Sequence, residues 1–352
     1  MQAASLQHRL AARATNSPVI VHPVFSFAGL FLVLAIGCSR SQDTAAESSR
    51  TDGGTPIQRV AVQLNWYPEA EHGGVYQAFA DGTYTAAGLG VDIRPGGRAT
   101  PVAPELELGR VQFAMANADD VVVFRREGMD IVAVMAVMQM SPRCILVRED
   151  SGVNDFAGLA GMTLQRQAGR SFLEFMRSKG ILDQVTEVPY HGSVSSLVAD
   201  PKIAVQAYSF AEPLLARQQG VEVRTLMVSD LGWNPYSSVL ITSGKLIRED
   251  PEQVRKFVQA TQQGWKNYIS DSSVGNAAIL AANKHGMTSD ALRFGSKELV
   301  PLALPEEMSI EKIGDMSLGR WATLVKQMDE LDPGSAGKVN PEECFTDEFL
   351  TQ

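Results

Sequence analysis

The chain has 352 residues, of which 45% are hydrophobic and 20% are charged, and its formal net charge is −9. This length and composition allow one large or two medium globular domains and exclude an intrinsically disordered chain. No basic patch stands out in this acidic sequence, which argues against nucleic acid as a partner. The three cysteines show no C-x-x-C spacing, so the sequence indicates neither a metal site nor redox chemistry. For Cys144 and Cys344 we expect two buried free thiols, with a disulfide between them as the alternative.

Residues 1–37 are predicted to be a signal peptide. They contain two arginines and no acid, followed by an apolar run over residues 24–37 that is too short to span a membrane comfortably. The run ends in LAIG before Cys38, which resembles the lipobox of bacterial lipoproteins. We therefore expect lipidation of Cys38, with an ordinary secretory signal as the alternative, and acyl chains would hold the protein at a membrane surface. Residues 38–57 are small and polar, as expected of a flexible tether.

From residue 58 the pattern becomes strand, turn and helix, repeated along the chain. Residues 59–66 are a near-continuous apolar run, which is typical of a parallel strand covered on both faces. A helix over residues 119–128 has acids at its start and arginines near its end, as the helix dipole favours. The predicted strands of this first series are residues 59–66, 91–97, 111–117, 131–139 and 143–149.

A second series of strands and helices runs over residues 162–229. The chain then passes through Gly232 into one more apolar strand, residues 237–243, and a long amphipathic helix begins at Pro251.

Because a strand returns after the second series, we predict two α/β lobes. The first comprises residues 58–141 with 238–352, and the second comprises residues 142–237. The two crossings would form a hinge, and ligands in such folds bind in the crevice at the carboxyl ends of the strands. Two independent consecutive domains are the alternative.

The stretch LNWYPEAEHGGVYQAFADGTYTAAGLGVDIRPGG, residues 64–97, resembles the opening of solute-binding proteins of the thiamine-pyrimidine and alkanesulfonate group. Further similar stretches are FAMANADDVVVFRREG, GMTLQRQAGRS, YSFAEP and NPYSSVLIT. The resemblance implies an α/β, type II periplasmic-binding-protein fold, a periplasmic or other extracytoplasmic location, and an ABC permease and ATPase as partners. We expect a monomer that contacts the membrane only through its lipid anchor.

The same group contains an enzyme branch, the fungal pyrimidine synthase. The resemblance implies that this branch uses a lysine and a histidine of its own with pyridoxal phosphate, at positions that fall near Ala116 and Asp120 here. A cysteine-rich stretch of the enzyme branch corresponds to residues 231–235, which contain no cysteine. The chain also lacks G-x-S-x-G, H-E-x-x-H and a complete P-loop. We therefore predict a binding protein without catalytic residues or cofactor, and keep the synthase as the alternative.

Three candidate ligand-binding residues lie on the turn after the first strand. Trp66 can stack on a flat heterocycle, and the alternative is a core tryptophan. Asn65 offers both a donor and an acceptor, although strand alternation places Asn65 and Trp66 on opposite faces. His72 precedes a double glycine at a helix start, where free N–H groups can meet a polar ligand, and the alternative is a structural, hydrogen-bonded histidine.

Other candidates follow the later strands. Asn117 and Asp119 end the third strand, and the alternative is that Asp119 or Asp120 caps the following helix. Ser141 and Arg143 flank the first crossing, and Arg143 could contact an anionic ligand group or a solvated carboxylate. Arg170 stands at a helix start, which suits a phosphate, sulfonate or carboxylate.

The motif Y-x-x-x-E-P supplies Tyr208 and Glu212. Glu212 could accept hydrogen bonds from the exocyclic amine of an aminopyrimidine, and the alternative is a first-turn acid that stabilises its own helix. Tyr190 and Tyr236 are candidate walls of the site, with packing as the alternative. The predicted ligand is a thiamine-precursor pyrimidine, and a flavin or an alkanesulfonate are the alternatives within binding.

Overall fold

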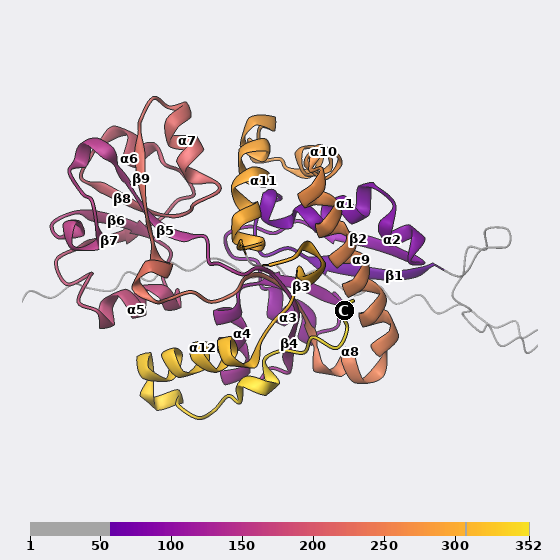
Figure 1. Cartoon of the computed structure of the whole chain (residues 1–352). Helices are drawn as coiled ribbons and strands as arrows, with labels where there is room; N and C mark the ends of the chain where they lie inside the picture. The colour runs from indigo at the N-terminus through magenta and orange to yellow at the C-terminus, as the bar shows by residue number, and fades with distance from the viewer. Residues whose placement is uncertain (1–56, 307, 352) are drawn as a thin grey trace, which may run out of the picture. The chain divides into compact units, whose positions relative to one another are not determined.

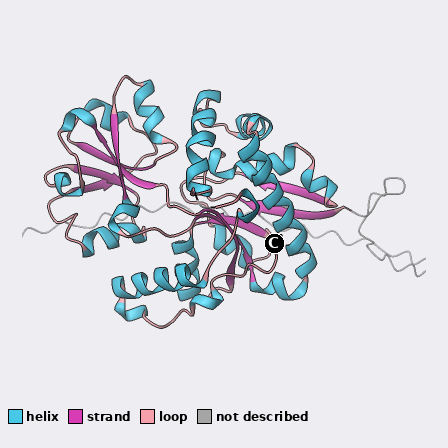
Figure 2. Ribbon diagram, in the orientation of Figure 1, coloured by secondary structure: helices cyan, strands magenta, loops and turns pink. Residues whose placement is uncertain are grey.

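The structure, a computed structural model, describes residues 57–306 and 308–351. These residues form two five-stranded sheets, and Figure 2 shows each group of strands surrounded by helices. The predicted signal peptide (residues 1–37), the predicted lipidation site Cys38 and all but the last residue of the predicted tether (residues 38–57) lie outside the described residues. None of the helices in the described ranges has the length and apolarity that crossing a membrane requires.

The first sheet is built around the parallel strands at the start of the chain. Val60 and Val62 on one face of β1 and Ala61 on the other are all buried, as expected of a strand covered on both sides. β1 pairs in parallel with β2 and β3, whereas β10 pairs antiparallel with β3 and β4. The strands, in spatial order, are β2 (Leu89–Arg94), β1 (Gln58–Gln63), β3 (Phe113–Ala116), β10 (Ser237–Ser243) and β4 (Ile131–Met138).

Helices from both ends of the chain pack around this sheet. In Figure 1, α9 and α10 lie beside α1, and α12 lies beside α4. The long helix α9 begins at Pro251 as predicted, where the carboxylate of Asp250 accepts the Gln253 N–H at 3.0 Å. The helices are α1 (Gly73–Ala80), α2 (Thr83–Ala86), α3 (Val102–Glu107), α4 (Ala118–Arg126), α8 (Gly244–Glu249), α9 (Pro251–Ser270), α10 (Ser273–Ala282), α11 (Ser289–Ala303) and α12 (Leu318–Leu331).

The second sheet is formed by the middle of the chain. β6 pairs in parallel with β7 and β8, and β5 pairs antiparallel with β8 and β9. Its strands, in spatial order, are β7 (Thr186–Pro189), β6 (Thr163–Arg166), β8 (Ile203–Tyr208), β5 (Arg143–Arg148) and β9 (Val223–Met227). Its helices are α5 (Ser171–Ser178), α6 (Ser195–Ala199) and α7 (Glu212–Gln218).

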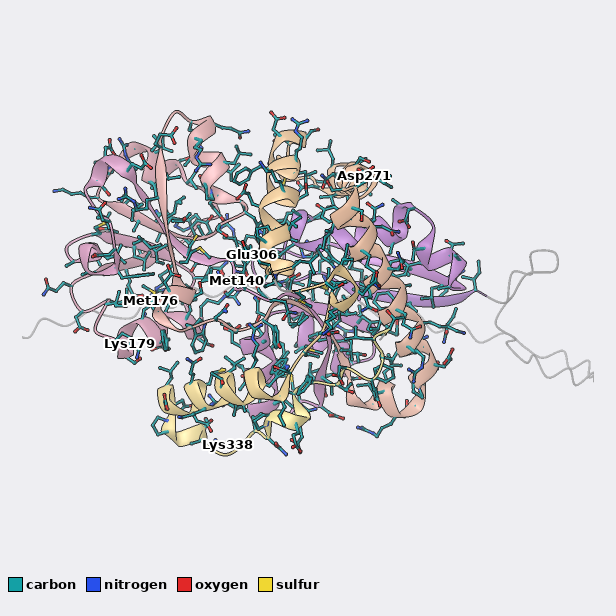
Figure 3. The ribbon with its side chains drawn as sticks, in the orientation of Figure 1. Met140, Met176, Lys179, Asp271, Glu306 and Lys338 are labelled. Atoms are coloured by element: carbon teal, nitrogen blue, oxygen red, sulfur yellow. The ribbon has the colours of Figure 1, made fainter. Side chains whose placement is uncertain are left out.

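The chain passes between the two sheets twice, from β4 to β5 and from β9 to β10. The Ser141 N–H donates to Oδ1 of Asn234 at 2.8 Å, so a hydrogen bond joins the two crossing segments. Figure 3 labels Met140 at the first crossing, where its N–H donates to the carbonyl oxygen of Leu302 at 2.9 Å. These observations confirm the predicted α/β fold with two lobes and a double crossing. Below, the first lobe denotes the first sheet with its helices, and the second lobe denotes β5–β9 with α5–α7.

The second crossing ends in a strained residue. Ser238 has φ 52°, a left-handed conformation that a serine adopts at some cost in free energy. Its buried hydroxyl donates to the carbonyl oxygen of Glu71 at 2.8 Å, which ties β10 to the turn after β1. Cys144 and Cys344 are both buried and free, as expected.

Candidate ligand-binding site

A cavity of about 170 Å³, here called the inner cavity, lies between the two lobes. The first lobe contributes residues that follow β1 and β3, and the second lobe contributes residues at the ends of β6, β7 and β8. The predicted candidates that line it are Asn65, Trp66, Asn117, Arg143, Arg170, Tyr190, Tyr208 and Glu212. Residues far apart in the chain therefore meet where the strands end, as in other open α/β folds.

Asn65 and Trp66 both reach the inner cavity because β1 ends at Gln63 and the chain then bends. Strand alternation, which would place the two side chains on opposite faces, therefore does not apply to Asn65 and Trp66. The Gly96 N–H donates to the carbonyl oxygen of Trp66 at 3.0 Å and holds the bend against the end of β2. Only glycine fits at residue 96, since an added Cβ would lie 2.2 Å from the carbonyl oxygen of Leu64. The partly exposed Trp66 ring packs edge-on against Tyr67 at 5.1 Å.

Glu212 is an oriented acceptor on the second lobe. Its Oε2 accepts the Tyr208 N–H at 2.8 Å, and its Oε1 accepts the Tyr190 hydroxyl at 3.1 Å. Burial raises the pKa of Glu212, although these hydrogen bonds act against the rise. Each carboxylate oxygen still has acceptor capacity that a ligand can use.

Two further carboxyl groups come from the turn after β1, and sequence reasoning assigned neither of them to the site. Glu71 is 2% exposed, and burial raises its pKa to about 7, while Arg143 and Arg170 act in the opposite direction. Burial, followed by the charges of Glu71 and Glu212, raises the pKa of Glu69 well above its ordinary value. Within the described ranges, Oε2 of Glu71 has no hydrogen-bond partner. The alternation of acids over residues 69–71 was the only sequence signal for this pair.

Contacts between the lobes flank the inner cavity. Nη1 of Arg170 lies 3.3 Å from Oδ1 of Asp120, and the guanidinium of Arg98 donates to the carbonyl oxygen of His191. Asp120 also accepts the Asn117 N–H at 3.1 Å at the start of α4. The capping role that we considered for Asp119 or Asp120 is therefore carried by Asp120. Sequence reasoning did not assign Arg98 or Asp120 to the site.

Arg143 is held within the second lobe. Its Nη2 donates to the hydroxyl of Tyr208 at 3.1 Å, and its guanidinium lies 5.0 Å from the centre of the Phe172 ring. The guanidinium of Arg143 thus lines the inner cavity, and one of its N–H groups is already bonded to Tyr208.

Four predicted residues lie outside the wall of the inner cavity, and three of them lie together. Asp119, Ser141 and Tyr236 surround a separate space of about 10 Å³, which has room for about one water molecule. The Tyr236 hydroxyl accepts the Ser317 N–H at 3.0 Å, and its ring packs against the guanidinium of Arg320 at 3.8 Å. Burial and the charge of Asp120 raise the pKa of Asp119 to about 6.

His72 is fully buried and does not line the inner cavity. Its Nδ1 accepts the Glu69 N–H at 3.4 Å, and its Nε2 lies 3.0 Å from Oδ1 of Asn65. Burial lowers the pKa of His72 to about 3, so the ring is neutral at physiological pH. The glycines that follow serve packing, since a Cβ on Gly74 would lie 2.2 Å from the ring of Trp265 in α9.

A second space of about 330 Å³, here called the outer cavity, adjoins the inner one. The two share Trp66, Glu69, Arg98, Tyr190 and Glu212. Apolar side chains line much of the outer cavity, together with the rings of Tyr67 and His285, which are tilted by 37° and have their centres 4.1 Å apart. The residues that only the outer cavity contains were not predicted. Its apolar lining includes Phe210, Leu215, Met287 and Leu292.

Two α/β lobes joined by two crossings, with a cavity between them at the strand ends, define the class of periplasmic-binding-protein folds. Among solved structures, the chain is similar to the periplasmic aliphatic sulphonate binding protein SsuA from Escherichia coli. The TM-score is 0.65 at 13% identity, over 85% of this chain and 93% of that one. The profile of the family described as NMT1/THI5 like matches residues 69–272. The chain belongs to this family, which confirms the resemblance that its sequence suggested.

Curated relatives include both binding proteins and an enzyme. The riboflavin-binding protein RibY of Chloroflexus aurantiacus is 27% identical over 69% of this chain and 73% of its own length. The formylaminopyrimidine-binding protein of Halalkalibacterium halodurans is 23% identical over 69% of this chain and 74% of its own. The 4-amino-5-hydroxymethyl-2-methylpyrimidine phosphate synthase of Legionella pneumophila is 20% identical over 83% of this chain and 92% of its own.

Proposed function

We propose that this protein is the extracytoplasmic solute-binding component of an ABC importer and that its inner cavity binds a small aromatic nitrogen heterocycle. A thiamine-precursor pyrimidine is the first candidate. The observation that carries the proposal is Glu212, a carboxylate fixed by Tyr190 and Tyr208 in a cavity to which the other lobe contributes Trp66. The carboxylate suits the exocyclic amine of an aminopyrimidine, and the indole suits the face of its ring.

The size and charge of the inner cavity favour a single-ring ligand that is not an anion. Its volume of about 170 Å³ is below the range of about 300–1,000 Å³ typical of sites for drug-sized ligands. Its charged residues are Glu69, Glu71, Asp120, Glu212, Arg98, Arg143 and Arg170. A sulfonate needs converging donors, whereas acids outnumber arginines in this wall, so the alkanesulfonate alternative fits this cavity less well.

In the proposed mechanism, the ligand selects the state in which the two lobes are in contact. Trp66 and Glu212 belong to different lobes, so a ligand that touches both binds that state better than one in which the lobes are apart. The crossings at Ser141 and Asn234 would act as the hinge. For the lobes we propose the limits predicted above, residues 58–141 with 238–352 and residues 142–237.

The cellular arrangement we propose rests on the sequence of the N-terminal region and on the family. Residues 1–37 would direct export, lipidation of Cys38 would anchor the protein, and residues 38–57 would tether it. A permease would recognise the ligand-bound monomer, and an ATPase would drive import.

A flavin is the second candidate ligand, and the outer cavity favours it. The two cavities share five residues, so a ligand too large for the inner cavity could extend into about 330 Å³ of additional space. A relative at 27% identity is named as a riboflavin-binding protein.

We propose a binding protein and not a synthase. A Schiff base with pyridoxal phosphate needs a lysine, whereas the cations in the described wall of the inner cavity are arginines. By the resemblance described above, the synthase lysine falls near Ala116, which is buried at the end of β3. Absorbance of bound pyridoxal phosphate on the purified protein would contradict this part of the proposal.

Native mass spectrometry of freshly purified protein, followed by calorimetric titration, tests the function. The titrations would use formylaminopyrimidine, hydroxymethylpyrimidine, riboflavin and an alkanesulfonate. We expect a pyrimidine to bind and Trp66→Ala and Glu212→Gln each to weaken binding at least about tenfold. Trp265→Phe, a buried change in α9 outside both cavities and away from the crossings, is the matched control for loss of an indole. Failure of every heterocycle to bind at saturating concentration would overturn the proposal.

A further inference from the structure

His72 lies between two residues of the inner cavity and contacts both. Its Nε2 is 3.0 Å from Oδ1 of Asn65 and 3.3 Å from Oε1 of Glu71. Asn65 and Glu71 both line the cavity, whereas His72 is completely buried behind them. One ring nitrogen therefore contacts one oxygen of each neighbouring side chain.

The hydrogen bonds of the histidine decide which nitrogen carries its proton. Nδ1 accepts the backbone N–H of Glu69, so Nδ1 is unprotonated and the proton of the neutral ring is on Nε2. Nε2–H can then donate to Oδ1 of Asn65, which fixes the orientation of the amide. An Asn65 amide with its oxygen turned to the histidine has its NH₂ group on the other side, available to the cavity.

Glu71 lies beside the same ring nitrogen. Its Oε1 is 3.3 Å from Nε2, whereas the hydrogen bond of Nε2 goes to Asn65, and its Oε2 is buried without a hydrogen-bond partner within residues 57–306 and 308–351. A buried oxygen without a partner is costly in free energy. The group that His72 orients toward the inner cavity is therefore the NH₂ group of Asn65.

We infer that His72 is a positioning residue, which orients Asn65 so that its NH₂ group is a fixed N–H donor in the wall of the inner cavity. A matching ligand turns an acceptor toward this donor, as in the ring nitrogen beside the exocyclic amino group of an aminopyrimidine. This chemistry distinguishes a 4-aminopyrimidine from its 4-oxo counterpart, in which the ring N–H donates and the oxygen accepts. The ligand class rests on the proposed function, whereas the orientation by His72 does not.

The test compares two nearly isosteric probes by calorimetric titration: 4-amino-5-hydroxymethyl-2-methylpyrimidine and its 4-oxo counterpart. For the wild type we expect the amino compound to bind at least about tenfold more tightly. His72→Leu removes the donor, so the ratio of the two dissociation constants should fall to within about threefold of one. His72→Gln offers an amide donor and acceptor and should restore part of the ratio. In the background of Asn65→Ala, His72→Leu should change the ratio less than it does in the wild type.

Tyr84→Phe is the matched control, because the Tyr84 hydroxyl lies 2.8 Å from Oγ1 of Thr261 in the core of the first lobe. It should lower the melting temperature and leave the ratio unchanged. An unchanged ratio in His72→Leu, with only the melting temperature reduced, would overturn the positioning role.

A ligand-free measurement separates the two proposals. ¹⁵N NMR of the wild type should show a neutral His72 with its proton on Nε2 at neutral pH. A proton on Nδ1, or a charged ring, would overturn the positioning role whatever binds. If NMR shows the expected tautomer and neither probe binds, the proposed pyrimidine ligand fails and the orientation of Asn65 by His72 stands.

Discussion

The hydroxyl of Tyr190 donates a hydrogen bond of 3.1 Å to Oε1 of Glu212, and this contact joins the end of β7 to the start of α7. The second oxygen of Glu212 accepts the backbone N–H of Tyr208. Two donors from different elements thus fix one carboxylate at the wall shared by the inner and outer cavities. The orientation is set before a ligand arrives, which reduces the entropic cost of binding.

Removal of this donor should weaken ligand binding without unfolding the protein. We expect Tyr190→Phe to raise the dissociation constant of the best heterocycle about five- to tenfold, which corresponds to about 1 kcal/mol, the typical net value of one hydrogen bond. Calorimetric titration measures the effect, and Tyr84→Phe, which removes a hydroxyl outside both cavities, is its control. Equal affinities for Tyr190→Phe and the wild type would show that Glu212 needs no such support.

The buried carboxyl of Glu71 should make stability depend on pH. Burial raises its pKa from 4.5 to about 7, so the folded protein binds this proton more tightly than the unfolded chain does. The protonated carboxyl of Glu71 stabilises the folded protein by about 3 kcal/mol below about pH 4.5. This stabilisation is lost as the pH rises from about 4.5 to about 7. The raised pKa values of Glu69 and Glu212 act in the same direction, whereas the lowered pKa of His72 acts in the opposite direction below about pH 6.5.

The melting temperature of the ligand-free protein should therefore decrease between pH 5 and pH 8. Glu71→Gln should reduce this decrease, because its side chain cannot ionise. Glu174→Gln, a change at an exposed acid on α5, should leave the decrease as it is. A profile for Glu71→Gln that parallels the wild type would contradict the buried, proton-binding state of Glu71.

The fold could be predicted because its pattern is local in the sequence. The apolar runs at residues 58–63 and 203–208 are strands in the structure, and the return of a strand at residues 237–243 implied two lobes with two crossings. Most candidate site residues follow strands directly, so a strand prediction also placed them at one edge of a sheet.

The remainder of the site depends on tertiary contacts that no local pattern encodes. Glu69 and Glu71 reach the inner cavity because of the bend after β1, and Arg98 lies in its wall because the lobes approach each other there. A histidine before two glycines looks the same in sequence whether it touches a ligand or packs in the interior. Only its hydrogen bonds to Glu69 and Asn65 distinguish these cases.

Two glycine substitutions should have opposite effects on stability. Gly74→Ala places a Cβ 2.2 Å from the ring of Trp265, so α1 and α9 must separate, and we expect a loss of about 2–3 kcal/mol in the free energy of unfolding. Gly319→Ala, in helix α12, has open space around its Cβ and should be neutral or stabilising by up to about 1 kcal/mol. Urea denaturation of both variants checks the pair, and equal stabilities would contradict the close packing of α1 on α9.

The ion pair between Arg170 and Asp120 should bias the ligand-free protein toward contact between its lobes. The pair joins the two lobes at 3.3 Å, and its side chains are 30% and 27% exposed. Its contribution to the free energy of lobe contact should therefore be modest, about 0.5–1 kcal/mol. Arg170→Met should therefore increase the radius of gyration of the ligand-free protein in small-angle scattering and weaken ligand binding about two- to fivefold. Affinity alone is ambiguous, because Arg170 also lines the inner cavity, so the scattering of the ligand-free protein decides the prediction.

Arg177→Met is the control, since it breaks pairs with Glu174 and Glu187 that lie within the second lobe and should leave the radius of gyration unchanged. If Arg170→Met and Arg177→Met scatter alike, the contact does not hold the lobes together.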